Sequence, residues 1–263
     1  MKLGVQLYGA MREFRADPDA FCARLAAAGY TELEPCISLS LSAEQLEKNG
    51  MSPVWQPEEV AGFVALMAKH GLGITTSHIF ADIHADADRA VALAKEHGIR
   101  YIVVNCQGGK EAEKFAAFGA ACKALAEKLK AVGSELWIHN GWPEIRANFD
   151  GKTGLEIALE AGEGLVGTQI DTGWVLYGGA DPLEYLKKVQ PYLRSVHYKD
   201  ICADYKETPL GDIHVALGKG AVDWEAIHTF AVENGFPEVI DQDASPDDFV
   251  KDLEETAALL KNA

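Results

Sequence analysis

Short runs that favour β structure alternate with longer helical patterns along the whole chain. The short runs predict eight strands, at 3–8, 31–34, 73–77, 101–105, 135–139, 166–171, 194–197 and 237–241. The longer patterns predict eight helices, at 18–28, 57–70, 86–97, 111–132, 154–161, 182–189, 224–234 and 246–260. Three segments are predicted as long loops, at 35–55, 140–152 and 200–222.

This alternation decides the fold class. Strands separated by helices need crossover connections, which make the sheet parallel and bury it on both faces. Eight such units in 263 residues predict an α/β protein, a single (β/α)₈ TIM barrel spanning 1–263. An open doubly wound sheet is the alternative, but it usually carries a glycine fingerprint after its first strand. Here that place reads Gly-Ala-Met-Arg, which favours the barrel.

Charge and cysteine content narrow the class of partner. With 40 acidic and 24 basic residues the net charge is −16, which disfavours nucleic acid and anionic membrane surfaces. The five cysteines include no CxxC pair, which argues against a disulfide framework or a zinc knuckle. We find neither a signal-peptide pattern nor a membrane-spanning run, and we expect a cytoplasmic protein that binds a small molecule. The long loops are candidates for shaping the pocket and for homo-oligomer contacts.

Polar and ionisable residues gather where the predicted strands end. The residues at these ends are Glu34, His78, Asn105 with Gln107, His139 with Asn140, Asp171, His197, and Asp241 with Gln242 and Asp243. In a barrel the carboxyl ends of the strands converge on one pocket, so packing alone is a poor explanation for so many polar ends.

Four of these residues form a candidate metal site. His139, Asp171, His197 and Asp241 each end one of the last four predicted strands. Two imidazoles and two carboxylates suit Mn²⁺, Zn²⁺, Fe²⁺, Co²⁺ or Mg²⁺. The alternative is that these side chains form hydrogen bonds to loop backbones.

Several segments resemble a known superfamily. They are 3–8 (Leu-Gly-Val-Gln-Leu-Tyr), 27–34 (Ala-Ala-Gly-Tyr-Thr-Glu-Leu-Glu), 138–140 (Ile-His-Asn), 169–174 (Gln-Ile-Asp-Thr-Gly-Trp), 195–200 (Ser-Val-His-Tyr-Lys-Asp), 218–224 (Gly-Lys-Gly-Ala-Val-Asp-Trp) and 239–243 (Val-Ile-Asp-Gln-Asp). In this order they resemble the xylose isomerase-like TIM-barrel superfamily, which contains sugar-phosphate isomerases and epimerases, inosose dehydratases and endonuclease IV. The resemblance implies a divalent metal held by His139, Asp171, His197 and Asp241, and a sugar or polyol substrate.

The chain departs from the family pattern at two of these positions. Many epimerases have glutamates at the places of His139 and Asp241, and those glutamates also move protons. Their paired-glutamate mechanism therefore does not transfer directly. Asp241 is shorter and could share its role with Gln242, and Glu144, five residues beyond His139, is a further candidate base.

The resemblance and the polar strand ends together predict an isomerase or epimerase. The expected reaction is proton transfer next to a carbonyl through a metal-stabilised enediolate. The candidate catalytic residues are Asp241, Lys199, His78 and Glu144, and the candidate substrate-binding residues are Glu34, Gln107, Trp174, Tyr8 and Trp142.

Most of these residues also have a plainer interpretation. Lys199 could pair with Asp200 on the rim, His78 could anchor a loop, and the aromatic residues could simply pack. Glu34 is also a candidate base. The run 108–110 (Gly-Gly-Lys) is either a phosphate site or, more simply, a turn.

Three other functions remain open. A dehydratase would use the same enediolate to expel a hydroxyl group, a nuclease would need more histidines and a basic groove, and a degenerate barrel would have lost both metal and catalysis. We expect His84, His214 and His228 to be surface or helix residues, and we expect no cysteine nucleophile.

Overall fold

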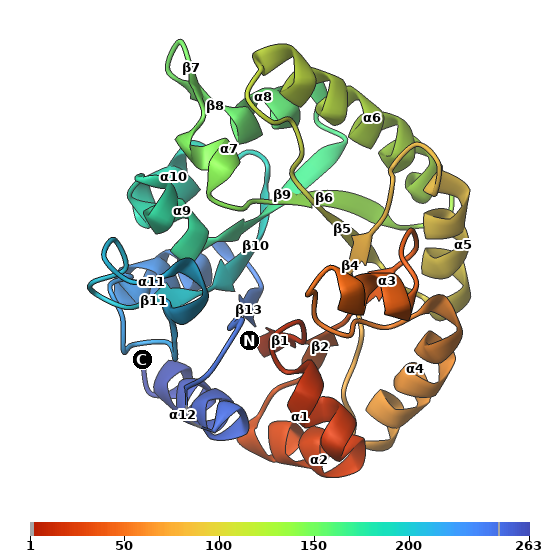
Figure 1. Cartoon of the computed structure of the whole chain (residues 1–263), viewed down its shortest axis with the longest axis vertical. Helices are drawn as coiled ribbons and strands as arrows, with labels where there is room; N and C mark the ends of the chain where they lie inside the picture. Colours follow the sequence, from red (N-terminus) through yellow and green to blue (C-terminus); the bar gives the residue numbers. More distant parts are fainter. Residues whose placement is uncertain (1–2, 247) are drawn as a thin grey trace.

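The computed structural model describes residues 3–246 and 248–263 and shows a parallel barrel surrounded by helices (Figure 1). Its strands are β1 (Leu3–Gln6), β2 (Glu32–Glu34), β3 (Cys36–Ser38), β4 (Thr76–Phe80), β5 (Tyr101–Asn105), β6 (Glu135–His139), β9 (Val166–Asp171), β10 (Leu193–Tyr198) and β13 (Glu238–Ile240). They form one sheet in the order β2-β1-β13-β10-β9-β6-β5-β4-β3. The predicted α/β class and TIM-barrel fold are confirmed.

Proline divides the second stave of the barrel into two strands. Pro35 has no N–H to donate, and it separates β2 from β3. β2 pairs with β1, placing Glu34 beside Gln6, whereas β3 pairs with β4, placing Cys36 beside His78. The first and last strands of the sheet order are thus two halves of one stave, and they close the ring.

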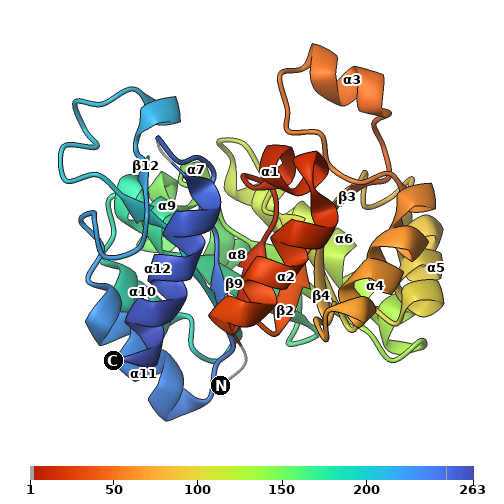
Figure 2. The same ribbon diagram turned by 90° about the horizontal axis from the view of Figure 1, so that it is seen from below.

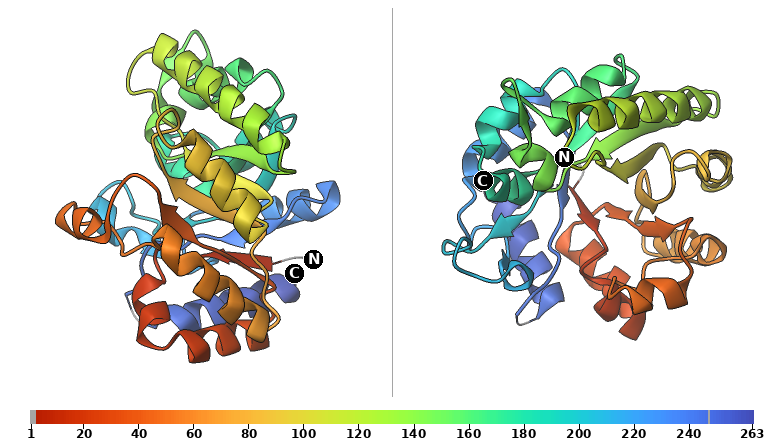
Figure 3. Two further views of the ribbon diagram at one scale, coloured as in Figure 1. Left: turned by 90° about the vertical axis from the view of Figure 1, so that its right-hand side faces the viewer. Right: turned by 45° about the horizontal axis from the view of Figure 1, so that its top comes forward.

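Helices lie around the outside of the strands (Figure 3). The long helices are α2 (Pro18–Ala28), α4 (Val60–Lys69), α5 (Ala87–His97), α6 (Ala112–Lys130), α8 (Gly154–Ala161), α10 (Pro182–Lys188), α11 (Trp224–Asn234) and α12 (Phe249–Lys261). They agree with the predicted helices to within a few residues. Residue 247, inside the last predicted helix, lies outside the described residues, as do residues 1–2 of the predicted domain. Across the described chain no helix has the length and apolarity to cross a bilayer.

The prediction that 35–55 is a long loop was wrong in part. It contains β3 and a short helix, α3 (Ala43–Lys48), which projects beyond the barrel (Figure 2). Ser42 caps α3, and Leu46 buries its side chain in a small cluster with Cys36 and Val54. A six-residue helix is too short for the sequence pattern to reveal.

The other two predicted loops also contain structure. Segment 140–152 holds α7 (Pro143–Arg146) and the hairpin of β7 (Asn148–Phe149) with β8 (Lys152–Thr153). Segment 200–222 holds the hairpin of β11 (Asp200–Ile201) with β12 (His214–Val215). Two further short helices, α1 (Met11–Ala16) and α9 (Thr172–Gly178), were not predicted.

The third predicted strand, 73–77, is displaced along the chain. It is observed as β4, which pairs with β3 from Cys36 onward and with β5 from Tyr101 onward. Residue Gly73 instead makes an isolated bridge with Glu32. The shift places His78 in the middle of a strand, where its side chain enters the barrel, rather than in a loop.

Candidate active site and metal centre

The carboxyl ends of the strands surround a cavity of about 340 Å³. Of the residues predicted to be catalytic, substrate-binding or metal-binding, this inner cavity is lined by Tyr8, His78, His139, Glu144, Trp174, Lys199 and Asp241. The polar ends of distant segments therefore do meet in one place, as the barrel topology requires.

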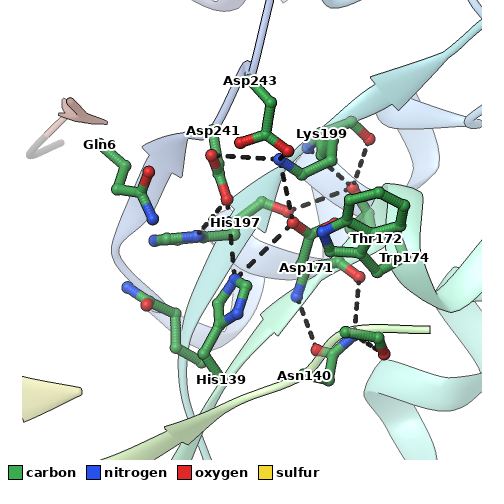
Figure 4. Close-up of polar contacts among 12 residues, drawn as sticks. Gln6, His139, Asn140, Asp171, Thr172, Trp174, His197, Lys199, Asp241 and Asp243 are labelled. Carbon is green, nitrogen blue, oxygen red and sulfur yellow. Dashed lines mark hydrogen bonds and ion pairs between the residues drawn. The ribbon is translucent and has the colours of Figure 1, made fainter. Parts of the chain in front are cut away.

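The four predicted metal ligands form one buried cluster (Figure 4). One nitrogen or oxygen atom from each of His139, Asp171, His197 and Asp241 lies within 4.8 Å of the others. The Nε2 atom of His139 is 3.7 Å from an oxygen of Asp171 and 3.7 Å from an oxygen of Asp241. The Nδ1 atom of His197 lies 3.2 Å from Asp241 Oδ2.

The chemistry of this cluster fits a divalent metal. His139 Nε2 and Asp171 Oδ2 are buried and have no hydrogen-bond partner among the described residues. Leaving such polar atoms unsatisfied is costly, and a cation bound between them would remove that cost. Mixed imidazole and carboxylate ligands suit first-row transition metals. Metal binding itself stays a prediction, and these residues are suitably placed for it.

A helix that the sequence pattern did not reveal orients Asp171. The Oδ1 atom of Asp171 accepts a hydrogen bond from Trp174 N at 2.9 Å and caps helix α9. The other oxygen, Oδ2, is thereby left to face His139. Asn140 binds the Asp171 backbone on both sides, accepting from its N at 2.9 Å and donating to its O at 3.3 Å. The capping residue Asp171 before Thr-Gly-Trp is the sequence signal that could have revealed α9.

Lys199 is a buried cation held by three carboxylates. Its Nζ donates to Asp243 Oδ2 at 2.7 Å and lies 3.2 Å from Asp241 Oδ1 and 3.6 Å from Asp171 Oδ2. The ammonium also lies 5.4 Å from the centre of the Trp174 ring. Burial alone would lower the pKa of Lys199, but Asp241, Asp243 and Asp171 outweigh burial and raise it. Lys199 is therefore a permanent positive charge.

The rim pairing between Lys199 and Asp200 that we considered is not observed. Asp200 instead binds backbone N–H groups of the following loop, including those of Gly218 and Gly220. Asp243, which was not among the predicted site residues, is the main partner of Lys199. The Val-Ile-Asp-Gln-Asp segment placed Asp243 near the pocket, but only the fold shows that it reaches this lysine.

Glu34 lies beneath the histidines and not on the wall of the inner cavity, contrary to its predicted contact with substrate. Its Oε1 atom is 3.1 Å from Nε2 of both His78 and His197. Gln169 completes the network, because its Nε2 donates to Glu34 Oε2 at 3.0 Å and its Oε1 lies 2.9 Å from His78 Nε2. Burial alone would raise the pKa of Glu34, but His197 and His78 outweigh it and lower the pKa. Glu34 is therefore placed to orient imidazoles.

Glu144 lies on the inner cavity wall, where a proton acceptor would be needed. It lies in α7, is 5% exposed, and accepts a hydrogen bond from Gly141 N. Burial raises the pKa of Glu144 to about 7. A carboxyl group with this pKa can both accept and donate a proton near neutral pH.

Two predicted substrate contacts lie away from the inner cavity. Trp142 packs against Tyr177, with ring centres 5.6 Å apart, and beneath the guanidinium of Arg146. Gln107 lines a neighbouring cleft and not the inner cavity. Both side chains follow turns whose direction cannot be read from the sequence.

The expectation of a surface or helical position was wrong for His214 and correct for His228. His214 lies in β12, is buried, and packs edge-on against Trp174 with its Nε2 3.9 Å from Asp243. His228 does lie in a helix, α11, but it is buried, with Nδ1 2.6 Å from Glu238. Polar partners that are distant in sequence allow these imidazoles to be buried.

The described cysteines are all free. Cys36 and Cys106 line the inner cavity, and burial raises the pKa of both thiols. A high thiol pKa leaves little thiolate at neutral pH.

Comparison with known proteins places the fold. A sugar phosphate isomerase/epimerase from Parabacteroides distasonis superposes with a TM-score of 0.77 and 19% identity, over 100% of this chain and 94% of that chain. The protein described as a probable 3-DHS dehydratase, AsbF, from Bacillus anthracis superposes with a TM-score of 0.72 and 14% identity, over 100% of this chain and 99% of that chain. The IOLI protein with a bound zinc atom superposes with a TM-score of 0.69 and 17% identity, over 99% of this chain and 96% of that chain.

At these identities the structural likeness shows the fold. No curated protein matches the sequence. The family model described as xylose isomerase-like TIM barrel matches residues 22–262, nearly the whole chain. The chain therefore belongs to the xylose isomerase-like TIM-barrel family.

Proposed function

We propose that this protein is a divalent-metal-dependent isomerase that acts on a sugar or sugar derivative by moving a proton next to a carbonyl. The observation that carries the proposal is the buried cluster of His139, Asp171, His197 and Asp241 with Glu144 on the same cavity. The sugar phosphate isomerase/epimerase of similar fold and the zinc atom bound by IOLI support the same chemistry.

The four clustered residues would hold the metal. A metal ion bound there would supply Lewis-acid polarisation of a substrate carbonyl. Lys199, next to Asp171 and Asp241, places a fixed positive charge where a substrate oxygen gains negative charge. Trp174 and Tyr8 offer apolar surface to the C–H face of a sugar.

Glu144 is the residue that we assign to proton transfer. The described residues of the inner cavity wall include three carboxylates, of which Asp241 belongs to the metal cluster and Asp243 is bound to Lys199. Within the described part of the chain Glu144 accepts hydrogen bonds only from backbone N–H groups, so its carboxylate can take a proton from carbon and return it.

A single free carboxylate also bears on the type of reaction. Epimerisation requires proton removal and return on opposite faces of the substrate, which takes two groups. One base working on one face suits aldose–ketose isomerisation or the elimination of water. A dehydratase is therefore the second candidate, and AsbF, described as a dehydratase, has a similar fold.

The test is proton exchange with solvent. Mn²⁺-loaded protein is incubated with a panel of aldoses, ketoses and inososes in D₂O, and ¹H NMR follows deuterium entry next to the carbonyl. We expect exchange to stop with a chelator and to fall at least about 100-fold in Glu144→Gln. Glu184→Gln, an exposed glutamate at the start of α10, is the matched control.

The outcomes separate the candidates. Reversible exchange supports the isomerase, whereas irreversible loss of water supports the dehydratase. Exchange that survives both chelation and Glu144→Gln would remove the proposal.

A further inference from the structure

A second and larger cleft adjoins the inner cavity. It measures about 600 Å³ and lies over the ends of β4 and β5, between the loops that follow them and α6. Phe80 and Asn105 line both spaces, so the two adjoin at these residues. We call the larger space the outer cleft. Nothing in the proposed proton transfer uses it.

The outer cleft has an apolar floor and a polar rim. Buried Ile79, Val104 and Phe118 form much of the floor. On the rim, the side-chain amides of Asn105 and Gln107 are exposed and make no hydrogen bond within the described part of the chain. An apolar surface with unengaged amide groups above it suits a flat ring that carries hydroxyl groups.

The charges of both spaces argue against a phosphate. Among the described lining residues the lysines are Lys114 and Lys199, and none is an arginine. Lys114 is paired with Glu111 at 2.9 Å, and Lys199 is already surrounded by carboxylates. Asp82 adds a negative charge to the rim of the outer cleft. A phosphate in the outer cleft would meet the carboxylate of Asp82 and no unpaired lysine or arginine among the described residues.

From this geometry we infer that the substrate is an unphosphorylated glycoside: a sugar unit in the inner cavity joined through a glycosidic oxygen to a neutral ring in the outer cleft. The inference rests on the proposed function for the sugar unit. The neutral ring is either a second sugar or an aryl group, since both present a flat face to the apolar floor.

The test blocks the outer cleft alone. Ala117 lines it from the exposed face of α6, so Ala117→Trp fills the space without disturbing the core. Ala120→Trp, on the same helix and also exposed, lines neither space and is the matched control. Gln107→Ala is a second variant, which removes a rim amide and no apolar packing.

Binding is measured by calorimetry and saturation-transfer NMR on Mn²⁺-loaded protein. The probes are glucose, galactose, their 6-phosphates, the disaccharides cellobiose, maltose and lactose, and phenyl glucoside and galactoside. We expect at least one glycoside to bind tenfold more tightly than its parent sugar and its phosphate ester. Ala117→Trp should abolish that tenfold gain, Gln107→Ala should reduce it, and Ala120→Trp should leave it unchanged. If a disaccharide binds more tightly than the phenyl glycosides, the ring in the outer cleft is a second sugar. If a phenyl glycoside binds more tightly than the disaccharides, that ring is an aryl group.

Two results would overturn the inference: a phosphate ester that binds more tightly than every glycoside, or no glycoside that gains affinity over its parent sugar. Either result leaves the Glu144-dependent proton exchange intact if the proposed function is right. Conversely, tight glycoside binding without proton exchange would support the inferred glycoside ligand and would contradict the proposed isomerase function.

Discussion

At the scale of single residues, the two oxygens of one carboxylate serve different purposes. Asp171 caps α9 with Oδ1 and faces the cluster with the unpartnered Oδ2. Lys199 likewise serves several groups at once, because its one ammonium lies among three carboxylates that would otherwise repel one another. These double roles allow a variant to remove one function while preserving the other.

Asp171→Asn should separate capping from metal binding. Asparagine caps helices as well as aspartate does, so the metal-free variant should unfold at a temperature no lower than the parent. We expect its Mn²⁺ affinity, measured by calorimetry, to fall at least about 100-fold, because a charged ligand is lost. Asp181→Asn, at the equivalent cap of α10, should leave the affinity unchanged. If Asp171→Asn bound Mn²⁺ as tightly as Asp181→Asn does, Asp171 would be excluded as a ligand.

Glu144 should make stability depend on pH. Burial raises its pKa from 4.5 to about 7, so between these values the folded chain holds a proton that the unfolded chain has released. The stability that this group contributes is therefore complete below about pH 4.5, falls as the pH rises to 7, and is constant above it. The loss is on the order of 3 kcal/mol.

Urea unfolding of chelated protein from pH 5 to 8 measures this dependence. Glu144→Gln should lose the decline and be more stable than the parent at pH 8, by on the order of 2–3 kcal/mol. The stability of Glu184→Gln should show the same dependence on pH as that of the parent protein. Parallel pH profiles for the parent and Glu144→Gln would show that the carboxyl group is not desolvated.

At the scale of elements, a buried aspartate organises the loop beside the site. The Asp200 carboxylate accepts hydrogen bonds from the backbone N atoms of Ile201, Gly218, Gly220 and Val222, at 2.9–3.1 Å. A Cβ atom on Gly220 would lie 2.2 Å from Asp200 Oδ1, so only glycine fits there. Gly220 is thus required by this anchor, which ties the segment 218–222 to Asp200 in β11.

Asp200→Ala should release this loop. Four backbone N–H groups lose their acceptor, and we expect a loss of about 2–4 kcal/mol in the free energy of unfolding. Limited proteolysis should cut within 202–217 in the variant while the barrel stays intact. Asp212→Ala, an exposed aspartate in the same loop, should resist cleavage as the parent does. A resistant Asp200→Ala would show that the loop is held by other contacts.

At the scale of the whole molecule, the barrel concentrates negative charge at its centre. The chain carries a net charge of −16, and Asp171, Asp241 and Asp243 lie around one buried lysine, Lys199. The first and last long helices hold the ring together from outside, where Arg24 of α2 binds Glu254 of α12 at 2.8 Å. A bound cation should therefore stabilise the entire fold.

Metal binding should be visible as a thermal shift. A ligand at 100 times its dissociation constant adds about 2.7 kcal/mol to the stability of the folded state. For a chain of this size we expect Mn²⁺ to raise the unfolding temperature by roughly 5–10 °C, and a chelator to reverse the shift. Asp171→Asn should show no such shift. A shift of equal size in that variant would place the metal elsewhere.

The sequence alone determined the architecture and the composition of the cluster. The alternation of strands and helices requires a parallel sheet, and eight units close it into a barrel. Because the carboxyl ends of barrel strands converge, four residues far apart in the chain could be assigned to one point before any coordinate was known. That holds for His139, Asp171, His197 and Asp241, since each lies at or next to the carboxyl end of its strand.

Tertiary structure decided what each of the other side chains does. Glu34 ends its strand as His139 does, and Gln107 follows a strand, yet Glu34 lies beneath the imidazoles and Gln107 lines the outer cleft. Asp243, His214 and α9 joined the site through contacts between segments distant in sequence. The physical reason is that strand periodicity sets the direction of a side chain only within the strand. Beyond its end, turns, caps and ion pairs with other segments set that direction.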